Sequence, residues 1–223
     1  MEVKIEKIIR SRRTTIELYI TDDARLIIRA PFSADEKTIN HFIEKHKRWI
    51  DKKIKLIKEQ RENFKEKRFV DGENFLYLGN NFKLNVVENK SKALLFDNGF
   101  YLSKDLSTCA KEIFEKCYKE KAKEIFTERA QYYSEIMNLK YSKIRIMSAK
   151  RRWASCSKKG NLNFNWRLVM APLNIIDYVV VHELAHLIEY NHKKKFWEKV
   201  EKVLPDYKLR RKWLKDNGYL LKI

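Results

Sequence analysis

The amino-acid sequence predicts an α+β fold. N-terminal antiparallel strands and long helices precede a C-terminal region that combines a small sheet with a buried helix. Short branched-aliphatic runs broken by polar joints are typical of strands, and they recur over 4–30, 69–102 and 143–166. The longer segments that follow each group have apolar residues at helical spacing. Strands grouped with helices of this length indicate an α+β arrangement rather than a bundle or a sandwich.

Three segments have the period of a helix that buries one face or more. They are residues 34–66, residues 105–138 and a segment that starts at Pro172 and runs to about residue 190. Pro172 suits a first helical turn. The third segment is apolar nearly all round, so we expect it to be central and buried. Two shorter helices are expected near His192 and over 206–216.

Composition indicates a folded protein without a membrane span. Apolar residues make up 44% of the 223, and glycine and proline are few. No apolar stretch is long enough to cross a bilayer, and the first residues lack the apolar core of a secretory signal. Three cysteines without a CxxC spacing favour free thiols in a reducing compartment. We therefore expect a cytoplasmic protein. No linker rich in Pro, Gly or Ser divides the chain, and a change of composition suggests two regions, residues 1–102 and 103–223.

The net charge of +19 is unevenly distributed. Residues 140–160 hold eight Lys or Arg and no acid, and residues 190–223 hold eleven bases and four acids. Such a surface attracts polyanions, among them nucleic acids and nucleotide phosphates. A lysine-rich solvated surface without a partner explains the same charge equally well.

The predicted buried helix contains His182, Glu183 and His186 in the pattern H-E-x-x-H. Histidines four residues apart lie on one face of a helix, where a single tetrahedral ion can bind both. Glu183 is rotated away from that ion and can act as a general base on a water molecule. Three neutral imidazoles and a carboxylate would be costly in an apolar helix without such a role. The pattern predicts one zinc ion per chain.

A catalytic zinc site needs a third protein ligand and an open position. His192 follows His186 by six residues, and a tight reversal at Asn191, a residue that tolerates the left-handed conformation, would return it to the ion. An acidic third ligand, Glu201 or Asp206, is the weaker alternative. The six-residue spacing also occurs in metzincins, but those have a glycine midway and a methionine turn downstream, which this chain lacks.

The segments RRWASCS, NLNFNWRLVMAP, DYVVVHELAHL and NHKKKFW together resemble the YgjP-like metallopeptidase-domain proteins, which are zincin-like metal-dependent hydrolases of bacteria and archaea. The resemblance covers nearly the whole chain, and its most specific part is the histidine-containing core. It implies a zincin-like C-terminal domain in which His182, His186 and His192 bind zinc and Glu183 is the base. The family usually has glycine where this chain has Ala154.

Three functions remain open at this level. The first is a zinc peptidase, favoured by the asparagine-rich strand 161–165, which offers an edge to an extended peptide or else is ordinary sheet. The second is a nucleotide or phosphoester hydrolase, favoured by the basic stretch 140–160. The third is a nucleic-acid-associated metalloprotein, in which aromatics among the bases would stack. Neighbouring residues in sequence supply candidates for substrate or transition-state contacts: Arg151, Arg152, Ser155, Tyr190 and Asn163. Oligomeric state is not indicated.

Overall fold

The computed structural model describes residues 5–88, 93–149 and 152–223, and the chain divides into two compact units, residues 1–65 and 66–223. The boundary expected from composition, near residue 103, falls inside the second unit. The sheet before that point and the helix after it share one core, in which Phe75 stacks on Phe114 with ring centroids 4.3 Å apart. A change in surface composition therefore does not coincide with a break in packing.

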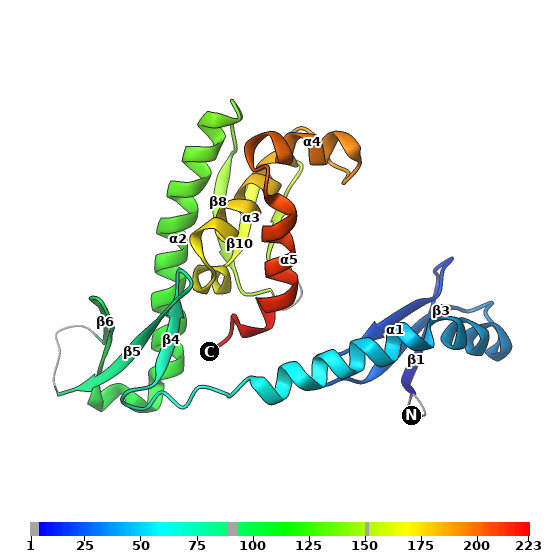
Figure 1. Cartoon of the computed structure of the whole chain (residues 1–223), viewed down its shortest axis with the longest axis horizontal. Helices are drawn as coiled ribbons and strands as arrows, with labels where there is room; N and C mark the ends of the chain where they lie inside the picture. Colours follow the sequence, from blue (N-terminus) through cyan, green and yellow to red (C-terminus); the bar gives the residue numbers. More distant parts are fainter. Residues whose placement is uncertain (1–4, 89–92, 150–151) are drawn as a thin grey trace. The chain divides into compact units, whose positions relative to one another are not determined.

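The first unit consists of a three-stranded sheet and one long helix, with strand order β1-β3-β2 (Figure 1). The strands are β1 (Ile5–Ser11), β2 (Glu17–Ile20) and β3 (Leu26–Pro31). The expectation of antiparallel strands is correct for β2 and β3 and wrong for β1, which runs parallel to β3. β3 lies between the two earlier strands; it is antiparallel to β2, which directly precedes it, and parallel to β1.

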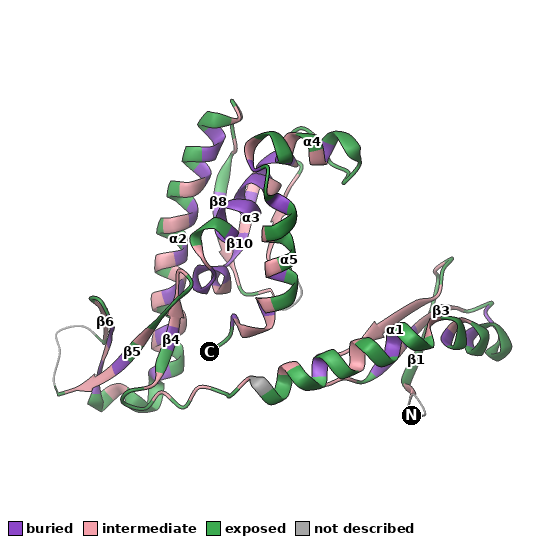
Figure 2. Ribbon diagram, in the orientation of Figure 1, coloured by how far each residue is buried: buried purple, intermediate pink, exposed green. Residues whose placement is uncertain are grey.

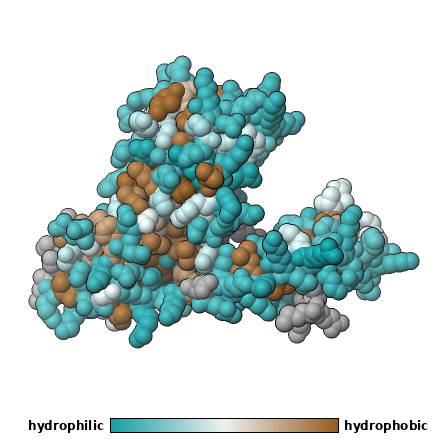
Figure 3. Space-filling model, in the orientation of Figure 1, coloured by the Kyte–Doolittle hydropathy of each residue, from teal (hydrophilic) through white to brown (hydrophobic). Residues whose placement is uncertain are grey.

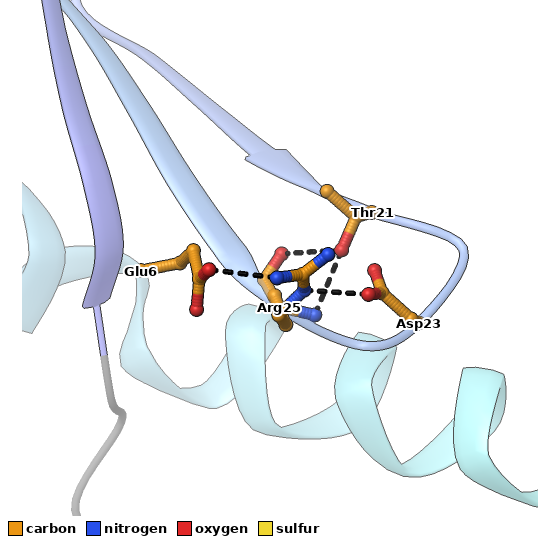
Figure 4. A network of polar contacts seen from close by, with 4 residues as sticks. All are labelled: Glu6, Thr21, Asp23 and Arg25. Atoms are coloured by element: carbon orange, nitrogen blue, oxygen red, sulfur yellow. Dashed lines mark hydrogen bonds and ion pairs between the residues drawn. The ribbon is translucent and has the colours of Figure 1, made fainter.

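The turn between β2 and β3 is held by Arg25 (Figure 4). Its guanidinium pairs with Glu6 of β1 at 2.7 Å and with Asp23 at 2.5 Å, and its backbone N–H donates to the Thr21 hydroxyl at 2.9 Å. Ala24 has a φ of 61°, which the tight turn requires. One residue thus joins the turn to the neighbouring edge strand.

Helix α1 (Glu36–Asn63) covers one face of this sheet and buries a stripe of its own residues (Figure 2). Its N-terminus is capped by the Asp35 carboxylate, which accepts from the Thr38 N–H at 2.8 Å. Ile39, Ile43 and Ile50 pack with the inward residues of β3. The helix predicted over 34–66 is therefore confirmed. Its isoleucines form the buried face, whereas Trp49, which was expected on that face, is 49% exposed.

The second unit begins with a four-stranded sheet of order β4-β5-β7-β6. Its strands are β4 (Asn74–Tyr77), β5 (Asn80–Val87), β6 (Leu94–Phe96) and β7 (Phe100–Ser103). A short 3-10 helix, η1 (Lys104–Cys109), leads into α2 (Ala110–Ile136), and Tyr118 of α2 donates a hydrogen bond to the Leu76 carbonyl at 2.6 Å.

A smaller sheet of order β8-β10-β9 packs beside α2 (Figure 1). β8 (Lys143–Met147) and β10 (Asn161–Asn165) are the predicted neighbours, and they run parallel. The segment that joins them contains a third strand, β9 (Ala154–Cys156), antiparallel to β10. Ala154 pairs with Phe164 and does not have a positive φ, so the alanine at this position causes no backbone strain.

The 3-10 helix η2 (Trp166–Met170) leads to α3 (Leu173–Ala185), which lies at the centre of the unit. Ten of its thirteen residues are buried, as the all-round apolar pattern predicts. The helix ends five residues before the predicted end near Tyr190, with His186 as its C-cap. Arg129 of α2 clamps α3 through a two-pronged ion pair with Asp177, at 2.6 and 3.0 Å.

The two further helices predicted near His192 and over 206–216 are α4 (Lys194–Val203) and α5 (Tyr207–Asn217). Both pack on α3, and a last 3-10 turn, η3 (Gly218–Leu220), follows. Hydrophilic residues cover most of the face shown in Figure 3. Among the described residues, none of the helices has the length and apolar character needed to cross a membrane.

Candidate metal centre

Two histidines lie one turn apart at the end of α3, and a third returns to them after the helix ends. His182 lies in the last turn and His186 is the C-cap. The chain then reverses, and Nε2 of His192 lies 3.1 Å from Nε2 of His186 and 3.0 Å from Nε2 of His182. One nitrogen from each residue lies within 4.8 Å of the other two. The structure therefore brings together the three histidines predicted from spacing.

The reversal does not use the left-handed conformation expected at Asn191, which is absent from the positive-φ residues. Instead, the helix tightens over Leu187–Glu189, whose N–H groups donate back to carbonyls of Leu184 and Ala185. The Lys193 N–H then donates to the Asn191 carbonyl at 2.8 Å. The early end of α3 is what gives the chain enough length to turn back.

The imidazoles fit a shared metal ion better than they fit one another. Nδ1 of His186 lies 3.0 Å from the Glu189 carbonyl, where only a protonated Nδ1 can donate, so Nε2 carries the lone pair. Nδ1 of His182 is buried and has no hydrogen-bond partner in the described part of the chain. Burial, followed by the neighbouring His186 and His192, lowers the pKa of His182 to about 3, so this ring is neutral. Neutral imidazoles with converging nitrogens are a metal-ligand arrangement.

Aromatic side chains of α4 fix the cluster from behind. Phe196 is fully buried, and its ring centroid lies 4.6 to 4.9 Å from those of all three histidines. The indole N–H of Trp197 donates to the His192 carbonyl at 3.2 Å. Phe196 and Trp197, which follow the third histidine in sequence, thus hold it in place by ring packing and by a hydrogen bond.

Glu183 lies beside the cluster and is 5% exposed. Its carboxylate accepts a hydrogen bond from the Cys156 backbone N–H in β9, and its Oε2 atom has no partner among the described residues. Burial raises its pKa to about 8, against the opposing effect of the Cys156 N–H. A carboxylate with one fixed and one free oxygen, next to a metal-binding cluster, is equipped to accept a proton.

Comparison with known proteins agrees with this geometry. The model of the YgjP-like, metallopeptidase domain family matches residues 14–217. The chain belongs to the YgjP-like family. This confirms the resemblance carried by the sequence segments around the histidines, and it identifies the chain as a metal-dependent, peptidase-like hydrolase.

Other comparisons add little to the family match. A solved structure that is similar to part of this YgjP-like chain is the metallopeptidase zymogen of Pyrococcus abyssi abylysin. The match has 26% sequence identity and a TM-score of 0.37, and it covers 40% of this chain and 93% of the abylysin chain. No curated protein matches the chain.

The acidic alternatives for the third ligand of this YgjP-like protein are engaged elsewhere. Glu201 pairs with Lys208 at 3.5 Å, and Asp206 pairs with Arg210 at 2.9 Å. Neither belongs to the group of potential ligands that the described residues form. His192 is the residue that geometry favours.

The other residues predicted from sequence have various positions. Asn163 donates from its side chain to the Ser155 carbonyl at 3.0 Å and hydroxyl at 3.2 Å, which ties β10 to β9. Arg152 is exposed and accepts, through its carbonyl, from the Asn165 side chain. Tyr190 is 65% exposed. Arg151 lies outside the described residues.

The asparagine-rich strand does not offer an edge for an added peptide, because β10 is the central strand of its sheet and pairs on both sides. Its neighbour β9 is an edge strand. The residues on either side of β9 bond to the β10 side of the sheet. The Trp153 carbonyl accepts from the Asn165 N–H, and the Ser157 N–H donates to the Asn161 carbonyl. In the alternating antiparallel pattern, the backbone of Cys156 therefore faces outward, toward Glu183.

Two residues close to the cluster were not among those predicted. Tyr178 lies one turn before His182 on α3, with ring centroids 5.9 Å apart, and burial raises its pKa to about 12. Its spacing of four residues from His182 is a signal that the sequence contained. Arg211 of α5 approaches through tertiary packing, and no spacing in the sequence indicates it.

Proposed function

We propose that this chain is a zinc-dependent peptidase, in which His182, His186 and His192 hold the ion and Glu183 is the general base. The observation that carries the proposal is the convergence of three imidazole nitrogens beside a buried carboxylate with an oxygen that has no partner among the described residues. The Nε2 separations of 3.0 and 3.1 Å are close to the roughly 3.3 Å expected for two nitrogens on one tetrahedral zinc ion. A site of three protein ligands leaves one position open, as catalysis requires.

The chemistry divides among the residues that surround the cluster. A zinc ion held by the three imidazoles supplies Lewis acidity and makes water easier to deprotonate. Glu183 accepts the proton at Oε2, while the Cys156 N–H holds its other oxygen. The water oxygen bonds to the carbonyl carbon of the peptide, the C–N bond breaks, and Glu183 gives the proton to the leaving amine. Phe196 excludes water from behind the imidazoles, because it is fully buried against them.

The free edge of β9 favours a peptide over other substrates. An extended peptide can add to the outer side of an edge strand through main-chain hydrogen bonds. The outward backbone at Cys156 already bonds to Glu183, so a peptide that added along Ala154 would lie beside the proposed base. The Tyr178 ring lies 5.9 Å from the His182 ring, and burial raises the pKa of its hydroxyl, which stays protonated.

The test pairs metal content with cleavage. Purified protein loaded with zinc is incubated with an unfolded protein substrate, and products are identified by mass spectrometry. The Glu183→Gln variant should retain one zinc per chain while cleavage falls by roughly a thousandfold or more, since the base is lost and the ligands remain. Cleavage that survives this substitution would contradict the assignment of the base.

Nucleotide hydrolysis is the second candidate, favoured by the three consecutive exposed lysines that follow His192, residues 193–195. The same two proteins are incubated with nucleoside triphosphates, and phosphate and pyrophosphate are measured. Release that depends on zinc and on Glu183, without peptide cleavage, would replace the peptidase by this function.

A further inference from the structure

Arg211 is an exposed cation without an acidic partner on a helix where most other bases have one. On α5, Lys208 pairs with Glu201, Arg210 with Asp206 and Lys212 with Asp216. Among the described residues, no carboxylate lies within ion-pair distance of Arg211. Lys215 is the other basic residue of this helix for which the described residues provide no ion pair.

The position of Arg211 is fixed by packing rather than by a charge partner. The preceding residue, Arg210, donates to the Asn174 carbonyl at 3.0 Å and so anchors α5 to the start of α3. The Arg211 guanidinium lies 4.9 Å from the centre of the Trp197 ring. The Trp197 ring also stacks with the Tyr207 ring, with centroids 5.2 Å apart and an interplanar angle of 14°. An arginine stacked in this way is held in place with its five N–H donors available.

Trp197 also brings Arg211 close to the metal centre. Its ring centroid lies 5.8 Å from that of His182 and 5.7 Å from that of His192. Burial is the main cause of the lowered pKa of both histidines, and the Arg211 charge is a further cause for each. The guanidinium and two of the three imidazoles therefore all lie close to the same aromatic ring.

The charges around the cluster do not balance when an ion is bound. A divalent ion on three imidazoles contributes two positive charges and Arg211 contributes a third, whereas Glu183 supplies at most one negative charge, because burial raises its pKa to about 8. A cation held beside another cation without a compensating acid raises the free energy of the protein unless an anion arrives. The arrangement is that of a recognition site for an anionic group of the substrate.

We propose that Arg211 is a specificity-determining residue that binds a carboxylate of the peptide substrate close to the bond that is cleaved. This inference rests on the proposed peptidase function. Arginine suits the role because its planar fork binds a carboxylate through two parallel hydrogen bonds. The carboxylate belongs to an acidic side chain or to the C-terminus of the peptide, and the substrates preferred by this protein are acidic.

The first experiment measures binding, independently of cleavage. Zinc-loaded Glu183→Gln protein is mixed with equal amounts of short acetylated, amidated peptides that differ by Glu or Gln at one position. A third set consists of the Gln peptides with a free C-terminal carboxylate. Bound peptides are recovered by size-exclusion chromatography and quantified by mass spectrometry. The Glu set or the free-acid set should be enriched roughly tenfold to a hundredfold over the neutral set, as for a charge-assisted pair. Which set is enriched identifies the source of the carboxylate.

The variants separate Arg211 from charge in general. In Arg211→Ala the enrichment should disappear, and in Arg211→Glu the acidic peptides should be depleted relative to the neutral set. Lys215→Ala removes a charge from the same helix and should leave the enrichment unchanged. Arg211→Lys should retain part of it. Circular dichroism of each variant shows that it is folded. Enrichment that persists in Arg211→Ala, or that Lys215→Ala removes equally, would overturn the inference, as would the absence of any enrichment.

The second experiment distinguishes this inference from the proposed function. The same peptides are given to zinc-loaded protein that retains Glu183. Arg211→Ala should raise KM for acidic peptides about tenfold or more and leave kcat and neutral peptides little changed. A fall in kcat for all peptides alike would keep the peptidase and reject Arg211 as a specificity residue. Arg211-dependent binding without any cleavage would keep the carboxylate site and reject the peptidase.

Discussion

The backbone N–H of Cys156 donates a hydrogen bond to the carboxylate of Glu183. This contact joins the edge strand β9 to the helix that carries two of the three histidines. It occupies one side of the carboxylate and leaves Oε2 without a partner among the described residues. The same short strand therefore orients the proposed base and presents a free edge beside it.

The Cys156 thiol should react slowly with alkylating agents at neutral pH. Burial, and secondly the Glu183 charge, raise its pKa to about 11, and the thiolate is the reactive form. Since the pKa is raised, the reactive fraction is small below it: roughly one thiol in a thousand at pH 8. Labelling with iodoacetamide, followed by peptide mass spectrometry, should modify the exposed Cys109 first. The rate at Cys156 should then rise about tenfold per pH unit toward pH 11. Equal rates at pH 8 would show that Cys156 is not buried as described.

His192→Ala should weaken metal binding by more than about a hundredfold, since loss of an indirect contact to a metal ligand already costs ten- to a hundredfold. Elemental analysis of dialysed protein should find near one zinc per chain in the wild type and far less in this variant. Asp206→Asn is the matched control, because Asp206 is the acidic alternative and pairs with Arg210 instead. If Asp206→Asn lost zinc and His192→Ala kept it, Asp206 rather than His192 would be the third metal ligand.

Phe196→Ala should destabilise the protein by about 3–5 kcal/mol, as for other fully buried aromatic side chains. Phe196 packs against all three imidazoles, so the variant should also bind zinc more weakly than its loss of stability alone explains. Urea denaturation of the metal-free protein measures the first effect, and a competitive zinc indicator measures the second. Phe196→Leu, which keeps most of the volume, should show both effects reduced. Unchanged zinc affinity in a folded Phe196→Ala protein would rule out the supporting role.

Asp177→Ala should destabilise the protein by about 3–5 kcal/mol, because the mostly buried Arg129 guanidinium loses its two-pronged partner and keeps the longer ion pair with Glu128, at 3.7 Å. The side chains of Arg129 and Asp177 are 16% and 10% exposed. Asp216→Ala breaks the exposed pair with Lys212 and should cost less than about 1 kcal/mol. Both are measured by urea denaturation. Equal losses of stability in the two variants would mean that the Arg129–Asp177 pair stabilises the protein no more than an exposed ion pair does.

Local sequence pattern was sufficient for much of the fold and for the centre of the site. His182 and His186 were identifiable because helix periodicity alone puts them on one face of α3. The parallel pairing of β1 could not be predicted from local pattern. It depends on which strand lies beside β1, and β3 inserts between β1 and β2. The true end of α3 depends on the hydrogen bond of His186 with Glu189, a contact that no helical period encodes.

Residues that reach the site from other elements were the least predictable. Arg211 belongs to a helix whose sequence shows several equivalent bases, and only the docking of α5 on α3 selects this one. Conversely, Ser155 and Asn163 belong to the segment that precedes the histidine helix, yet they bond to each other across two strands. Proximity along the chain was a poor guide wherever tertiary packing decides which side chain faces the cluster.

The early end of α3 affects how rigid the backbone around the histidine cluster is. His186 and His192 are joined by only five residues, so an ion bound to both acts as a cross-link that closes a very short loop. Closing a short loop removes little entropy from the unfolded chain, so the global stability gained from this cross-link is modest. The larger effect is local: metal removal should leave both units folded while backbone amides of residues 187–193 exchange faster with deuterium.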